Sequence, residues 1–195
     1  MGTGSDEYGR LIGPIESRMM RSIWRIVGDP HDAEDALQEA LAAIWKSLRR
    51  VQEHPNPEAL ILKMCANAAY DALRRRRRRA AVGLAVDIED ASASPAESAL
   101  RAERRAEILE AVSRLSRKQA VAVMMRDLED MSYEDISQTL GCSEPTARTH
   151  VARARTRLAT LLPHLLDHRP KKENRCEESD RPELRDAFSP ERELR

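Results

Sequence analysis

The side chains best suited to chemistry lie between residues 57 and 79. At helical spacing, one face of this stretch carries a cation, an amide and an aromatic ring, supplied by Lys63, Asn67, Tyr70 and Arg74. Cations bind phosphates, amides read base edges and aromatic rings stack on unpaired bases, so the combination suits a nucleic-acid strand. The alternative is structural, with Tyr70 packed between helices and Asn67 capping a turn.

Six consecutive arginines, residues 74–79, end this stretch. Asp71 can pair with Arg74 or Arg75 one turn away, which leaves five arginines without a local carboxylate. Like charges in a row repel one another, and a polyanion partner is the simplest compensation. A solvated basic helix end, favoured by the helix dipole, is the alternative. We predict that Arg74, Arg75 and Arg76 bind nucleic acid together with Lys63, Asn67 and Tyr70.

A second nucleic-acid signal is a helix-turn-helix pattern. Residues 133–140 predict a short helix, Gly141-Cys142 a tight turn, and residues 144–162 a basic helix. This arrangement places the second helix in the major groove, with its first turns near base edges and its later arginines near phosphates. The candidate residues are Ser143, Glu144, Thr146, Arg148 and Thr149 near the start, and Arg153, Arg155 and Arg157 further along.

An acidic face is predicted on the helix of residues 31–50, opposite its apolar stripe. Its residues are Asp32, Glu34, Asp35, Gln38 and Glu39. From composition alone, these are a solvated first turn favoured by the helix dipole. The functional interpretation is a docking patch for a basic partner.

Other function classes find no support in the sequence. No glycine-rich phosphate loop, nucleophile elbow or HExxH motif is present, so neither an enzyme, a cofactor nor a metal site is expected. The three cysteines are far apart, which favours a reduced, cytoplasmic setting. No apolar run reaches the length of a membrane span, so no membrane insertion is expected.

The elements that must position these residues are all helices. Aromatic residues make up only 3% of the 195 residues, charged residues 34%, and the net charge is zero. Helix starts are expected at Asp29-Pro30, Asn56-Pro57, Ser94-Pro95, Ser116 and Ser143. The predicted helices span residues 11–27, 31–50, 57–79, 95–114, 117–129, 133–140 and 144–162. We therefore predict an all-α fold with two small helical domains, at residues 10–80 and 95–162. A flexible linker at 81–94 joins them, and a charged, disordered tail follows at 163–195.

Together these motifs resemble the extracytoplasmic-function group of the bacterial sigma-70 family. Residues 28–29, 32–39 and 44–45 are similar to sigma region 2.1–2.2, and Asn67, Asp71 and residues 73–75 to region 2.3–2.4. Residues 115–116, 131–136, 140–143, 152–155 and Leu158 are similar to region 4. The resemblance covers about residues 10–162.

The resemblance implies a transcription initiation factor that binds core RNA polymerase. Region 2 would dock its acidic patch on the β′ clamp helices, then recognise and open the −10 promoter element. Region 4 would bind the β flap and read the −35 element. An anti-sigma factor is a further implied partner. Two other classes remain open: a stand-alone helix-turn-helix transcriptional regulator, and a helical adaptor with an adventitious basic run.

Overall fold

The computed structural model describes residues 3–81 and 95–166, and every regular element in this part of the chain is a helix. Most of the expected linker and the expected disordered tail beyond residue 166 lie outside the described residues, whereas residues 163–166, where that tail was expected to begin, are helical. The helices are α1 (Thr3–Ile12), α2 (Glu16–Val27), α3 (Pro30–Lys46), α4 (Leu48–Gln52), α5 (Pro57–Ala81), α6 (Pro95–Ser113), α7 (Arg117–Val123), α8 (Tyr133–Leu140), α9 (Glu144–Leu161) and α10 (Pro163–Leu166), with a π-helical segment, η1 (Met124–Leu128).

Several helix ends follow from local side chains. Asp29 caps α3 by accepting a hydrogen bond from the backbone N–H of Asp32 at 2.8 Å, ahead of Pro30 in the first turn. Asn56 caps α5 in the same way at 3.0 Å from the Ala59 N–H. The helix-turn-helix turn uses Gly141 at φ 65°, a left-handed conformation that glycine adopts without steric cost. Ser116 precedes α7 as expected, but its side chain makes no capping hydrogen bond.

Three of the expected helices are interrupted. The chain turns at residues 13–15, so the single helix expected over 11–27 is replaced by α1 and α2. Pro14 lies in this turn, and its backbone nitrogen has no hydrogen to donate to a continuing helix. The helix expected over 31–50 breaks at Ser47 into α3 and α4, and the helix expected over 117–129 changes to π-helical hydrogen bonding at Met124.

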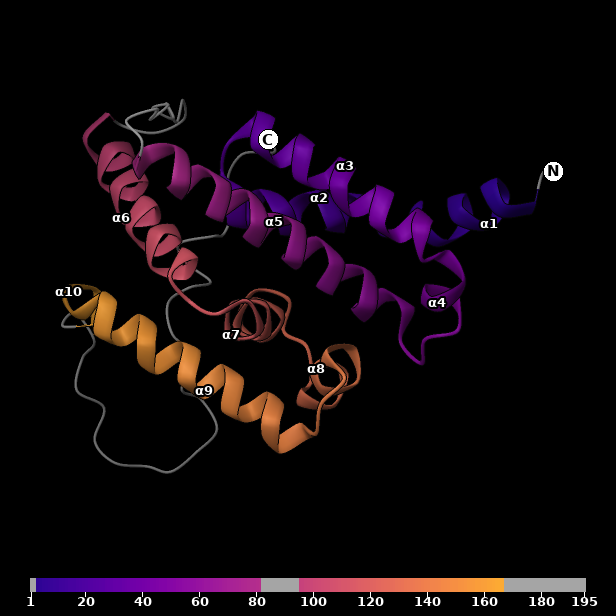
Figure 1. The fold of residues 1–195 in the computed structure, drawn as a ribbon. Coiled ribbons are helices and arrows are strands. Elements are labelled where there is room, and N and C mark those ends of the chain that lie inside the picture. The colour runs from indigo at the N-terminus through magenta and orange to yellow at the C-terminus, as the bar shows by residue number, and fades with distance from the viewer. Residues whose placement is uncertain (1–2, 82–94, 167–195) are drawn as a thin grey trace.

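The N-terminal half of the fold is built around α5. Helices α2 and α3 both pack against it, as Figure 1 shows. Buried side chains of this group include Ile23, Ile26, Ala36, Ile44 and Ile61. The exposed faces of α3 and α5 carry the acidic and basic candidate residues.

The C-terminal half is a helical array in which α7 and α8 pack against α9, and α6 contacts α9. Four apolar residues at helical spacing form a buried stripe along α9, namely Ala147, Val151, Ala154 and Leu158. The stripe holds the helix against its neighbours and leaves its opposite face to solvent.

The two halves pack against each other. Helix α5 contacts α6, α7, η1 and α8, and Figure 1 shows α7 and α8 between α5 and α9. Buried side chains from both halves form one continuous hydrophobic cluster. The residues predicted to bind nucleic acid on α5 therefore lie beside the C-terminal half of the chain.

Candidate nucleic-acid interface

The start of α9 presents its predicted base-reading residues to solvent. Ser143, Thr146, Arg148 and Thr149 are exposed, and Glu144 is partly exposed. The Ser143 and Thr146 hydroxyls lie 2.9 Å apart, and the Thr149 hydroxyl donates to the Pro145 carbonyl at 2.8 Å. These groups have the exposure that a recognition helix needs in the major groove.

Arg148 is held in position by two neighbours. Its guanidinium forms an ion pair with Glu144 at 2.6 Å and lies over the Tyr133 ring, with its Cζ atom 4.3 Å from the ring centroid. Stacking on an aromatic face restrains a long flexible side chain. Arg148 is thus partly preorganised at the surface, where a base edge could replace the Glu144 carboxylate.

Arg155 differs from the other arginines of α9. Its guanidinium binds Asp127 of η1 at 2.6 Å, and the Asp127 side chain is only 4% exposed. A buried carboxylate needs such a partner. Arg155 therefore contributes to the packing of α9 on η1, and its phosphate contact stays a prediction. Arg153 and Arg157 are exposed and form no ion pair with any described residue.

A shallow hollow lies beside the later turns of α9. It is lined by Arg114, Gln119, Ala152, Arg153, Thr156, Arg157 and Thr160. Three arginines and two hydroxyl side chains around one concave surface suit an anion such as a DNA phosphate. Gln119 and Arg114 come from outside the helix-turn-helix, so the sequence pattern did not include them.

The predicted nucleic-acid face of α5 is only partly accessible. Lys63 and Asn67 are partly buried, and the Asn67 amide donates to the Lys63 carbonyl at 2.9 Å. Burial and the nearby charge of Arg50 both lower the pKa of the Lys63 ammonium. Both effects disfavour the charged ammonium, and a phosphate beside Lys63 would offset them by stabilising the charge.

Tyr70 is 1% exposed, with its hydroxyl donating to the Leu115 carbonyl at 2.5 Å. The geometry matches the structural alternative considered for Tyr70 from the sequence. No base can stack on this ring while α5 and the turn at residue 115 remain in contact. Base stacking on Tyr70 stays a prediction, and it requires the two halves to separate.

The arginine block is more extensively paired than the sequence predicted. Arg75 contacts Glu39 of α3 at 3.0 Å, Arg79 contacts Asp32 at 2.8 Å, and Arg77 contacts Glu110 of α6 at 3.3 Å. The sequence interpretation, which found no local carboxylate for five of the arginines, therefore missed these partners. It considered only carboxylates close in sequence, whereas α3 and α6 supply acids through tertiary packing. Arg76 and Arg78 form no ion pair within the described residues.

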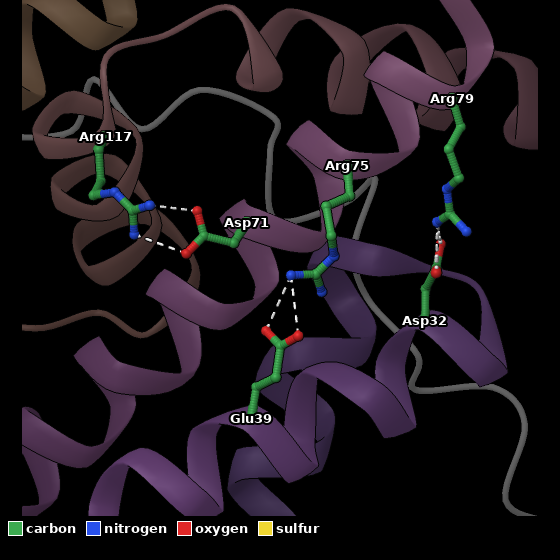
Figure 2. A network of polar contacts seen from close by, with 6 residues as sticks. All are labelled: Asp32, Glu39, Asp71, Arg75, Arg79 and Arg117. Atoms are coloured by element: carbon green, nitrogen blue, oxygen red, sulfur yellow. Dashed lines mark hydrogen bonds and ion pairs between the residues drawn. The ribbon is translucent and has the colours of Figure 1, made fainter. Parts of the chain in front are cut away.

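Asp71 also departs from its expected pairing. Instead of Arg74 or Arg75, it forms a two-pronged ion pair with Arg117 at the start of α7, and one of the two contacts measures 2.9 Å. Figure 2 shows this pair together with Arg75–Glu39 and Arg79–Asp32. The sequence around Arg117 did not indicate this ion pair, because Asp71 lies in the other half of the fold.

The acidic face of α3 divides into paired and unpaired residues. Asp32 and Glu39 bind Arg79 and Arg75, and the hydrogen bond that Arg79 donates to Asp32 raises the pKa of Arg79. Glu34, Asp35 and Gln38 are exposed and form no side-chain hydrogen bond or ion pair with a described residue. The free part of the predicted docking patch is therefore centred on Asp35.

The described residues show few features of a metal site, a redox site or a membrane span. No three of their His, Cys, Asp or Glu side chains are grouped as metal ligands. Cys65 is buried, and burial raises the pKa of its thiol to about 12, so it lacks the thiolate that redox chemistry requires. No helix in this part of the chain combines the length and apolar character that crossing a bilayer demands.

Two known protein-family models match the parts of the chain that carry these surfaces. The model of sigma-70 region 2 matches residues 11–79, and the model of sigma-70 region 4 matches residues 105–158. The chain belongs to the sigma-70 family, in its extracytoplasmic-function group. The candidate face of α5 and the acidic face of α3 both fall in the region 2 match. The helix-turn-helix of this sigma-70 family chain falls in the region 4 match.

Two curated relatives show the extent of the similarity. The extracytoplasmic-function RNA polymerase sigma factor SigE of Mycolicibacterium smegmatis is 28% identical over 158 residues, which cover 80% of this chain and 61% of that protein. The RNA polymerase sigma-E factor of Streptomyces coelicolor is also 28% identical, with 80% of this chain and 86% of that protein covered. This sigma-70 family chain thus spans about three fifths of the first relative and most of the second.

A solved structure has a similar fold. It is the sigma factor RpoE from Bartonella quintana, in complex with the anti-sigma factor NepR. The likeness has a TM-score of 0.50 at 23% identity and covers 80% of this chain and 96% of that chain. It supports the all-helical architecture of this sigma-70 family chain.

Proposed function

We propose that the chain is a transcription initiation factor that binds core RNA polymerase and directs it to promoters. The observation that carries this proposal is the presence of sigma regions 2 and 4, in that order, on one chain. A stand-alone helix-turn-helix regulator has no use for region 2 and its acidic face, so that alternative is not favoured. The proposed role is binding rather than catalysis, and it places the protein in the cytoplasm with its polymerase.

Docking on the β′ clamp helices is assigned to α3. Its proposed residues are Asp32, Glu34, Asp35, Gln38 and Glu39. Asp35 and its exposed neighbours meet a basic partner without prior rearrangement. Asp32 and Glu39 must first exchange Arg79 and Arg75 for cations of the partner. These ion pairs are partly exposed, so the exchange costs about 1 kcal/mol or less for each pair.

Recognition and opening of the −10 element are assigned to α5. The proposed residues are Lys63, Asn67, Tyr70, Arg74, Arg75 and Arg76. Lys63 supplies a cation in a partly buried setting, and Asn67 supplies an amide for base edges. Unstacking a base costs a few kcal/mol, which an aromatic ring and hydrogen bonds can offset. Arg74 lies 5.9 Å from the Tyr70 ring centroid and extends this surface toward the DNA backbone.

Recognition of the −35 element is assigned to α9. Ser143, Glu144, Thr146, Arg148 and Thr149 are the proposed base readers, and Arg153, with Arg157 and Arg114, is proposed to bind phosphates. The hollow beside α9 supports the phosphate assignment. Region 4 is also proposed to bind the β flap. An anti-sigma factor is a proposed regulator, as one accompanies the similar Bartonella quintana protein.

Run-off transcription tests the proposal directly. Purified chain and bacterial core polymerase without another sigma factor are incubated with a library of genomic fragments. We expect discrete transcripts that require the chain, and weak duplex binding by the chain alone. Tight promoter binding without polymerase would favour the stand-alone regulator. Absence of any transcript that depends on the chain would exclude the proposed function.

A further inference from the structure

One face of α5 is occupied by the C-terminal half of the same chain. The Tyr70 hydroxyl donates to the Leu115 carbonyl at 2.5 Å, and the Arg117 guanidinium binds the Asp71 carboxylate with two contacts. Arg117 also approaches the Asn67 side-chain oxygen at 3.4 Å, and its Cζ atom lies 5.8 Å from the Tyr70 ring centroid. Residues 115–117 thus contact Asn67, Tyr70 and Asp71 together.

These contacts use the groups that a DNA base would use. A guanidinium is planar and stacks on aromatic rings, as a base does. The Asn67 oxygen that approaches Arg117 is an acceptor that a base amino group could use. The turn at 115–117 therefore fills, with protein atoms, the recognition site proposed for the −10 strand.

Further contacts hold the two halves together around this turn. Asn56 before α5 donates to Asp135 of α8 at 2.8 Å. Arg18 of α2 lies 3.3 Å from Glu129, and Arg105 of α6 donates to the Trp24 carbonyl at 2.9 Å. The shared hydrophobic cluster adds burial across the same boundary. The occupied state of α5 is thus part of an extended interface.

We propose that the α5 face around Tyr70 binds the region 4 half in the free protein, in competition with single-stranded −10 DNA, and that Arg117 latches this closed state. The part of this proposal that concerns DNA binding rests on the proposed function. Arg117 is 49% exposed and Asp71 36% exposed, so the latch is reachable by water and salt. Exposed pairs contribute modestly, which keeps the closed state reversible. DNA binding on α5 then requires the turn at 115–117 to leave.

The test changes Arg117 in the full chain and uses its neighbour as a control. R117E places a carboxylate opposite Asp71 and repels it. K118E makes the same charge change on Lys118, which is exposed and forms no ion pair with a described residue. The double variant D71R/R117D reverses the pair and should restore it. Small-angle scattering reports the radius of gyration, and hydrogen exchange reports the protection of amides in α5 and α7.

A second experiment measures the affinity of each variant for a fluorescent pool of short, random single-stranded DNA. We expect R117E to increase the radius of gyration and to speed hydrogen exchange in α5 and α7. R117E should also bind the single-stranded DNA about twofold to fivefold more tightly than K118E does, as expected for the loss of one exposed ion pair. D71R/R117D should return scattering and exchange to the wild-type values. Unchanged scattering and exchange in R117E would overturn the latch.

A third result separates the opening of the protein from its competition with DNA. If R117E opens the protein without gaining affinity over K118E, the closed state does not compete with DNA and the proposal is overturned. Failure of the proposed function would appear differently, as a wild-type chain that supports no promoter-dependent transcription. Scattering and exchange still decide the role of Arg117 in that case, because neither measurement depends on transcription.

Discussion

The Tyr70 hydroxyl on α5 donates a 2.5 Å hydrogen bond to the Leu115 carbonyl, which lies in the turn between α6 and α7. These residues belong to the two regions of the sigma-70 fold, so this bond crosses the boundary between them. Tyr70 is among the largest side chains that are fully buried. A residue proposed to act on DNA therefore also stabilises the packing of the two halves.

Tyr70 substitutions should separate these roles. We expect Tyr70→Phe to lower the free energy of unfolding by about 0.5–1.5 kcal/mol, because it removes one hydrogen bond and keeps the ring. Tyr70→Ala should cost about 3–5 kcal/mol, since it leaves a large cavity. Urea denaturation at fixed pH measures both. Equal losses for the two variants would show that the hydroxyl, rather than the ring, carries the stability.

Asn67 allows a cleaner test of strand opening, because it is only partly buried. We expect Asn67→Ala to slow open-complex formation while leaving core polymerase affinity unchanged. Permanganate footprinting of −10 thymines compares a duplex template with a pre-melted bubble. A defect on the duplex that the bubble rescues supports a melting role. Equal loss on both templates, with a lowered melting temperature, would assign Asn67 to the protein core.

Acid should weaken the contact between α5 and α8. Hydrogen bonds from Ser132 and, secondarily, from Asn56 lower the pKa of Asp135. Because the folded state favours the carboxylate, its stabilisation is complete above the unfolded pKa of about 3.9 and is lost as pH falls through the lower folded pKa. We expect Ser132→Ala to reduce this part of the pH dependence. Urea unfolding between about pH 6 and about pH 2 measures it, with Asp135→Asn as the variant that cannot titrate.

Local signals in the sequence account for much of the fold. Asp29-Pro30 and Gly141 act through the backbone beside them, so the start of α3 and the end of α8 could be predicted. The break at Ser47 could not, because residues 31–50 keep their helical periodicity across it. The helical spacing of its apolar residues accounts for the buried stripe of α9, since burial there depends on a repeat within one element.

The candidate site was less predictable, because its contacts join distant parts of the chain. Tyr70 and Leu115 are 45 residues apart, and Arg117 and Asp71 are 46 apart. A helical face defined by spacing cannot reveal which neighbouring element will cover it. Arg155 shows the same effect within the C-terminal half, because its buried partner Asp127 lies on another element.

The arginines of α9 should respond differently to removal. We expect Arg155→Ala to lower the free energy of unfolding by about 1–3 kcal/mol, because the buried Asp127 carboxylate loses the guanidinium that binds it. Arg153→Ala should leave stability unchanged and lower the salt dependence of −35 DNA binding by about one phosphate contact. Thermal unfolding and binding at several salt concentrations measure these effects. A change at Arg155 in the salt dependence of DNA binding alone would assign Arg155 to a phosphate contact instead.

Arg148 should affect sequence preference instead. It is exposed, near the start of α9, and held by Glu144 and the Tyr133 ring. We expect Arg148→Ala to change the preferred base at one −35 position by about 1–3 kcal/mol while the salt dependence changes little. Binding to a set of singly substituted −35 duplexes measures this. If Arg153→Ala shifted base preference and Arg148→Ala did not, the orientation of α9 on DNA would be reversed.

The docking surface on α3 offers a test that does not involve DNA. Asp35 is exposed and unpaired within the described residues, whereas Glu39 binds Arg75 at 3.0 Å. Asp35→Lys should therefore weaken core polymerase binding by placing a cation against a basic partner, without removing either partner of an internal ion pair. Glu39→Lys should weaken it too, and should also repel Arg75, so its effect on stability is larger.

Glu103→Lys makes the same charge change at an exposed acid of α6 and serves as the control. Affinity for labelled core polymerase at fixed salt, with helical content followed by circular dichroism, measures the three variants. If Asp35→Lys and Glu103→Lys bound with equal affinity, α3 would not be the docking surface.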